Sequence, residues 1–256
     1  MLKQFLTALA LVILVSACST SPTGRSRMAF MPAQQMSSLG AQAFAEMRQK
    51  QPVARNPGLN AYVNCVARQV VAQVPGPQDW EVTVFQDESA NAFALPGGKI
   101  GVYTGLLDVA RDQHQLAAVI AHEVAHVLAE HANERMSTAT LAQAAQVAGA
   151  VLTDNPQIAQ ALGLGARYGV LLPYSRLHES EADELGLVMM ARAGFNPQAA
   201  VQLWRNMAAE GGAQPPEFLS THPSHGTRID DLQARMSRAM AAYQQALAQG
   251  RRPDCR

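Results

Sequence analysis

The residues best suited to chemistry are two histidines and a glutamate in His122-Glu123-Val124-Ala125-His126. On a helix with 3.6 residues per turn, His122 and His126 lie one turn apart on one face, so both imidazoles can point at one tetrahedral cation. Glu123 projects about 100° away around the helix axis, where its carboxylate can act as a general base on water at the cation. The motif alone is moderately specific, so a third ligand is needed to support a zinc site.

A second group of acids offers that ligand, at the start of a helix predicted over 179–193. Glu179 and Asp183 share a face because they are four residues apart. We expect Glu179 to ligate zinc and Asp183 to accept the outer N–H of a ligand histidine, which would fix its orientation. Glu181 points to nearly the opposite side, so we expect it and Glu184 on a solvated helix surface.

The surrounding pattern predicts an α+β, mainly α domain. Apolar residues at helical spacing predict a long region over 106–134, divided near 111–114 into a short helix and the longer helix that carries the motif. Three short segments with strand patterns, the last two joined by a Pro-Gly-Gly turn, predict a small antiparallel sheet. The strands are expected at 81–86, 92–95 and 100–103, and the other helices at 33–51, 56–74, 198–209 and 228–248.

Composition bounds the class of protein. Twenty basic residues balance twenty acidic ones among 256, so there is no field of one sign to recruit nucleic acid. With 48% hydrophobic residues the chain can bury a core. We expect one globular domain over 33–256 and no nucleic-acid partner.

The N-terminal residues resemble a bacterial lipoprotein signal. Residues 1–17 combine a positive start with an apolar stretch too short to span a bilayer. Val15-Ser16-Ala17-Cys18 resembles the lipobox, which implies a lipidated Cys18, anchored by its acyl chains in a membrane. An ordinary signal peptide with an incidental cysteine is the alternative. Ser19 favours an outer-membrane location facing the periplasm, and residues 18–32, rich in Ser, Thr, Pro and Gly, are expected to form a flexible tether.

Two cysteines remain once Cys18 is assigned to the anchor. Exported proteins meet an oxidising compartment in which a cysteine pair can be bridged. We therefore expect a disulfide between Cys65 and Cys255.

The ordered motifs together resemble a known family. HExxH followed by Ser-Arg-x-x-Glu-x-x-Ala-Asp, here residues 175–183, is similar to the zinc metallopeptidases that include HtpX and the CAAX prenyl endopeptidases. The lipobox, the chain length and the residues from Asn91 most resemble its periplasmic lipoprotein branch, such as LoiP and BepA. The resemblance covers roughly residues 33–237. It implies a zincin-like (gluzincin) fold with a small sheet beside the motif helix, one Zn²⁺ per chain, Glu179 as third ligand and Asp183 as the following acid.

The same resemblance adds a late histidine near the zinc site. The family has a late His-Pro followed by Arg, and residues 220–228 match it. His222 would then approach the zinc, either stabilising an oxyanion or closing the site as a further ligand, and His225 is the nearby competitor. The alternative is that either is a surface histidine in a loop that contains Pro and Gly. Strand residues Asn91, Ala92, Phe93 and Ala94 are expected to pair main chain to main chain with an extended substrate, or simply to complete the sheet.

These expectations lead to a function. The chain would be a zinc-dependent endopeptidase of the bacterial envelope that cleaves misfolded or unassembled outer-membrane proteins and works beside the outer-membrane assembly machinery. The rival interpretation is an envelope assembly factor or chaperone with a structural or inhibited zinc site, and a weaker one is an anchored scaffold with an accidental motif. The Ala-rich residues 137–172, with Gly163, Gly165 and Gly169, are expected to pack as helices or to cover the cleft.

Overall fold

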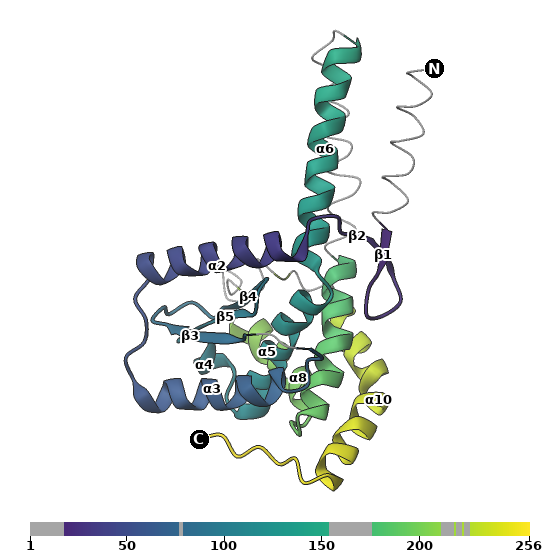
Figure 1. Ribbon diagram of the computed structural model, residues 1–256. Coiled ribbons are helices and arrows are strands. Elements are labelled where there is room, and N and C mark those ends of the chain that lie inside the picture. The colour runs from purple at the N-terminus through teal and green to yellow at the C-terminus, as the bar shows by residue number, and fades with distance from the viewer. Residues whose placement is uncertain (1–17, 77–78, 154–175, 211–217, 219–221, 223–225) are drawn as a thin grey trace.

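The computed structural model describes most of the chain, namely residues 18–76, 79–153, 176–210, 218, 222 and 226–256. The proposed export signal (1–17), His225 and most of the expected cover, including its three glycines, lie outside the described residues. The described part is mainly helical with a small sheet (Figure 1), which confirms the α+β class. Within it, no helix has both the length and the apolar character needed to cross a bilayer.

The main sheet has three strands in the order β3 (Glu81–Phe85), β5 (Lys99–Tyr103) and β4 (Ala92–Leu95). β4 and β5 form the expected antiparallel hairpin, but β3 pairs with β5 in parallel. The prediction of an antiparallel sheet is therefore wrong, and the sheet is mixed. The physical reason is that β5, the most buried of the three strands, takes the centre, which leaves β4 at an edge.

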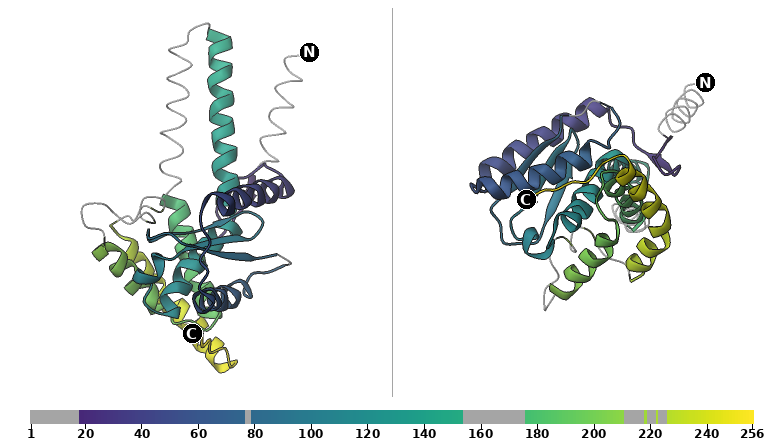
Figure 2. Two further views of the ribbon diagram at one scale, coloured as in Figure 1. Left: turned by 90° about the vertical axis from the view of Figure 1, so that its left-hand side faces the viewer. Right: turned by 90° about the horizontal axis from the view of Figure 1, so that it is seen from below.

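Helices cover both faces of this sheet. α2 (Ala33–Lys50) lies on one face, where its Phe44 packs with Phe85 and Phe93. α3 (Pro57–Val71) lies on the other face, with the main core between (Figure 2). The predicted bounds of both helices agree with the observed bounds to within three residues at each end.

The motif helix α5 (Gln113–Leu128) runs through the main core. Asp112 caps it, because its carboxylate accepts hydrogen bonds from the main-chain N–H groups of the first turn. The short α4 (Leu106–Val109) precedes it, as predicted. The helix does not continue to residue 134, because Glu130 adopts a positive φ of 53° and the chain turns into α6 (His131–Thr153), which extends away from the body (Figure 1).

The C-terminal half is helical as expected. A helix over residues 176–192 is followed by α8 (Gln198–Glu210) and α10 (Arg228–Ala248). Gly194 ends the first of these with a φ of 89°, and a Cβ there would lie 2.3 Å from the carbonyl oxygen of Arg251. Glycine is therefore required both by the backbone conformation and by the close approach of the C-terminal tail.

The expected flexible tether is instead an ordered hairpin at residues 18–28. β1 (Cys18–Thr20) pairs antiparallel with β2 (Ser26–Met28), and β2 lies beside α6. Composition predicts flexibility because the segment is rich in Ser, Thr, Pro and Gly, but two arginines attach it to the domain through ion pairs. Arg25 binds carboxylates on two helices, and Arg27 donates to the carbonyl of Ala129 and to Glu130.

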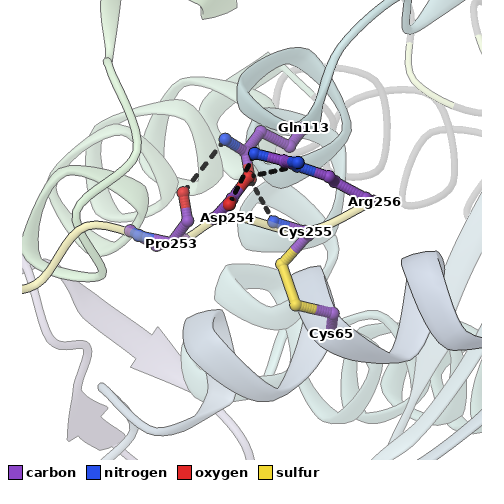
Figure 3. The surroundings of a disulfide bond; sticks show 6 residues. All are labelled: Cys65, Gln113, Pro253, Asp254, Cys255 and Arg256. Atoms are coloured by element: carbon purple, nitrogen blue, oxygen red, sulfur yellow. Dashed lines mark hydrogen bonds and ion pairs between the residues drawn. A yellow bond between two sulfur atoms is a disulfide. The ribbon is translucent and has the colours of Figure 1, made fainter.

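The disulfide between Cys65 and Cys255 is present, as predicted. It joins α3 to the C-terminal tail across 190 residues of sequence. Gln113 holds the same tail, because its side chain donates to Pro253 and accepts from the N–H of Cys255 (Figure 3). The tail is thus fixed to both α3 and the start of the motif helix.

We predict that replacing both cysteines by alanine lowers the free energy of unfolding by about 5 kcal/mol, because a 190-residue loop is then no longer closed in the unfolded chain. Urea titration followed by circular dichroism measures this difference. Reductant should destabilise the wild type and leave the double variant unchanged. Equal midpoints for all four samples would contradict the prediction.

Candidate metal centre

Four donor groups from three segments converge on one point. The ligand atoms of His122, His126, Glu179 and His222 all lie within 4.8 Å of one another. His122 Nε2 is 3.1 Å from His126 Nε2, and the Glu179 carboxylate oxygens lie 3.3 and 3.4 Å from these two nitrogens. Tetrahedral zinc with bonds of about 2.0–2.2 Å requires donor separations of about 3.3–3.6 Å. Imidazoles and a carboxylate at this spacing are therefore a chemically suitable donor set for zinc.

Close packing of two helices brings the donors together. His122 and His126 lie one turn apart on α5, and Glu179 comes from the helix over 176–192. A Cβ at Gly186 of the second helix would lie 2.9 Å from the main-chain nitrogen of His122. The absence of a side chain at Gly186 thus allows the helices to approach closely enough for Glu179 to reach both imidazoles.

Asp183 and Arg228 support the first histidine from behind. Asp183 Oδ1 lies 2.9 Å from His122 Nδ1, so an ionised Asp183 accepts a hydrogen bond from the Nδ1–H group, which leaves Nε2 free to bind a cation. Arg228 donates to the same Oδ1 at 2.6 Å, and its guanidinium stacks 3.4 Å from the ring centre of Trp204. Burial opposes ionisation of Asp183, yet the charge of Arg228 and the bond to His122 keep its pKa below the usual range.

Burial and the neighbouring polar groups have opposite effects on the charges of the site residues. Burial opposes protonation of His122, but hydrogen bonds to Asp183 and Glu179 raise its pKa to about 9. For Glu179 burial also opposes the charge, and the three surrounding imidazoles hold its pKa well below the usual range. For His126 burial dominates and lowers the pKa well below the usual value. The two carboxylates thus favour a positive charge among the histidines, which a divalent cation would supply.

Glu123 faces the same point without joining the donor set. It is 3% exposed, and burial raises the pKa of its carboxyl group above the usual value, while the positive charge available to His222 and His122 partly opposes this. A raised pKa makes its carboxylate a stronger proton acceptor near neutral pH. This is the position and the environment that a general base requires.

His222 lies at the site, whereas its competitor His225 is outside the described residues. His222 Nδ1 is 3.1 Å from a Glu179 oxygen, and Nε2 is 3.3 Å from Glu123. Its main-chain N–H donates to the carbonyl of Phe218, and the two rings stack with centres 4.5 Å apart. The histidine is therefore held between the candidate ligand and the candidate base.

A cavity of about 790 Å³ opens beside these residues. Of the four predicted substrate-strand residues, Phe93 and Ala94 line it, whereas Asn91 and Ala92 are buried away from it. β4 is an edge strand, so within the described residues its outer side pairs with no further strand. The cavity also touches three residues of the chemical centre, namely Glu123, His126 and His222.

Sequence reasoning missed a second polar cluster. His131, His178 and Glu181 are each at most 5% exposed, although Glu181 was expected on a solvated face. Glu181 binds Arg25 and His131, and Glu134 binds Arg25. Despite the opposing effect of burial, hydrogen bonds from Arg25 and His178 lower the pKa of Glu134 to about 2. The spacing of His131, five residues after His126, was the available signal.

Comparisons with known proteins agree with this geometry. The sequence model of a protein family, described as Peptidase family M48, matches residues 53–236. The mitochondrial metalloendopeptidase OMA1 of Schizosaccharomyces pombe is 41% identical over 177 residues, which are 67% of this chain and 51% of that protein. The putative beta-barrel assembly-enhancing protease of Vibrio cholerae is 33% identical over 201 residues, 74% of this chain and 41% of that protein.

A third relative, the beta-barrel assembly-enhancing protease of Escherichia coli, is 27% identical over 208 residues, which are 77% of this chain and 43% of that protein. The chain spans about half the length of the curated relatives it matches, or less. The family match covers well over half of the chain and includes the histidines of α5 and Glu179. The chain therefore belongs to peptidase family M48.

Proposed function

We propose that the protein is a zinc-dependent endopeptidase of the bacterial cell envelope. The observation that carries the proposal is the convergence of His122, His126 and Glu179 on one point, with the buried carboxylate of Glu123 beside it. Similarity to proteins named metalloendopeptidase and beta-barrel assembly-enhancing protease supports the same activity.

The residues divide into distinct roles in this mechanism. His122, His126 and Glu179 would hold zinc, which when bound supplies Lewis-acid activation of water and of the scissile carbonyl. Glu123 accepts a proton from the attacking water and returns it to the leaving amine. His222 either donates to the developing oxyanion or closes the site as a fourth donor, and its contacts with Glu179 and Glu123 are compatible with both.

The substrate would bind as an extended chain along the outer side of β4. Main-chain pairing gives affinity with little dependence on sequence, which suits unfolded segments of many proteins. Phe93 and Ala94, which line the cavity, would contact it nearest to Glu123. We therefore propose misfolded or unassembled envelope proteins, including outer-membrane proteins, as substrates.

The cellular location rests on the N-terminal sequence. Cys18 in its lipobox-like context would carry the acyl anchor, and Ser19 favours the outer membrane, facing the periplasm. The Cys65–Cys255 disulfide supports an oxidising compartment. Partners among the outer-membrane assembly machinery belong to the same proposal, because two relatives are named for enhancing β-barrel assembly.

The second candidate is an assembly factor or chaperone with a closed zinc site. The proximity of His222 to the other donors favours it, since structural zinc usually has four protein ligands. A Glu123→Gln variant that still rescues an envelope defect, without degrading substrate, would favour this candidate over the peptidase.

We predict that Glu123→Gln lowers the turnover of casein by about 10²–10⁴-fold, because the amide cannot accept the proton of water. Zinc content should stay at one per chain. Glu46→Gln, which changes an exposed glutamate of α2, is the matched control and should retain full turnover. Wild-type turnover by zinc-loaded Glu123→Gln would refute the assignment of the base.

We predict that Asp183→Asn weakens zinc binding about 10–100-fold, because the amide no longer holds the Nδ1 proton of His122 as a carboxylate does. Competition with a chromogenic chelator measures the dissociation constant. Glu184→Gln, on the next residue but paired with the surface side chains of Arg235 and Arg238, should bind zinc like the wild type. Equal affinity of the two variants would rule out the proposed role of Asp183.

A further inference from the structure

A buried ionic cluster lies directly behind the second histidine of α5. It consists of side chains from the N-terminal hairpin, α6 and the helix over 176–192, namely Arg25, His131, Glu134, His178 and Glu181. Its four helical members are each at most 5% exposed. Burying so many charged or ionisable groups costs free energy of desolvation, even when they pair with one another. The cluster therefore calls for a functional explanation.

His131 connects this cluster to His126. His131 Nδ1 lies 2.8 Å from His126 Nδ1, and His131 Nε2 lies 3.2 Å from Glu181 Oε2. An ionised carboxylate only accepts, so the Nε2–H group of His131 donates a hydrogen bond to Glu181. His131 Nδ1 is then an acceptor, and the short contact requires that His126 Nδ1 carries a proton. In a neutral imidazole this leaves His126 Nε2, which faces His122 and Glu179, as the free donor atom.

The hairpin fixes the carboxylate at the start of this chain of hydrogen bonds. Arg25 donates to Glu181 through Nε and Nη2 at 2.9 and 2.8 Å, and the hydroxyl group of Thr23 donates at 2.5 Å. Arg25 also makes a two-pronged contact with Glu134 at 2.8 and 2.7 Å. The planar guanidinium thus fixes two buried carboxylates at once, and keeps Glu181 ionised and correctly placed.

We infer that the N-terminal hairpin sets the tautomer and orientation of the His126 ligand, through Arg25, Glu181 and His131 in series. These three are positioning residues, and the inference rests on the metal centre of the proposed function. The arrangement parallels Arg228 and Asp183 behind His122, with one imidazole added to span a longer distance. Zinc affinity therefore depends on a segment that lies only a few residues after Cys18, the proposed anchor.

The test compares variants that keep or remove the acceptor for His126. His131→Leu removes it, whereas the amide oxygen of His131→Asn can take the place of Nδ1. Arg25→Met releases Glu181, and Arg27→Met is the matched control, because Arg27 attaches the same hairpin through Ala129 and Glu130 without touching Glu181. Thermal unfolding of each variant checks that the domain is intact.

Two readouts separate this inference from the zinc assignment. In competition with a chelator, His131→Leu and Arg25→Met should bind zinc about 10–100-fold more weakly, while His131→Asn and Arg27→Met should stay near wild type. In the metal-free protein, ¹⁵N NMR of labelled histidines should show His126 protonated at Nδ1, and His131→Leu should change that state. Wild-type affinity in His131→Leu, or a wild-type His126 protonated at Nε2, overturns the inference. A wild type that binds no zinc, with the Nδ1 proton present, would instead refute the proposed function alone.

Discussion

The rest of the structure depends on one contact, in which the nitrogen and oxygen lone pairs of two imidazoles and a carboxylate face the same buried point. Two imidazoles and a carboxylate within 3.1–3.4 Å of each other, with His222 adjacent, would repel and lose their hydration unless a shared cation or shared protons offset the cost. Much of the remaining fold serves this contact. The motif helix is buried through most of its length, and Gly186 lets a second helix pack against it at the level of His122. The disulfide fixes the C-terminal tail to α3, and Gln113 holds the tail at the start of the same motif helix.

Each histidine of the motif is supported by a different part of the chain. His122 is held by Asp183, which in turn is held by Arg228 at the start of α10. His126 contacts His131, and through it the cluster that includes the N-terminal hairpin. The chemical centre therefore depends on segments far apart in sequence, while the edge strand β4 and the adjoining cavity lie where the proposed function would place an extended substrate. Rigid support of this kind holds catalytic groups in the geometry that the proposed hydrolysis would require.

Local sequence patterns predicted those features of the site that depend only on residues close together in the chain. The spacing of His122 and His126, and of Glu179 and Asp183, follows from helix geometry, and the structure brings all four together. Strand order could not be read in the same way, because it depends on which strand the core buries most, and β5 rather than β4 is central. The prediction that Glu181 is solvated was wrong. Residue spacing within one helix shows which side chains share a face, but it does not reveal that a hairpin covers the opposite face. That hairpin was itself missed, because its attachment comes from Arg25 and Arg27 and not from apolar residues.

The central claim is that one zinc ion is held by two imidazoles of α5 and the carboxylate of Glu179. Diffraction data collected on both sides of the zinc absorption edge, from crystals of the purified protein, test it most directly. The account predicts one anomalous peak per chain, about 2.0–2.2 Å from His122 Nε2, His126 Nε2 and a Glu179 oxygen. A crystal of zinc-supplemented protein without such a peak, or with Glu179 turned away from it, would contradict the account.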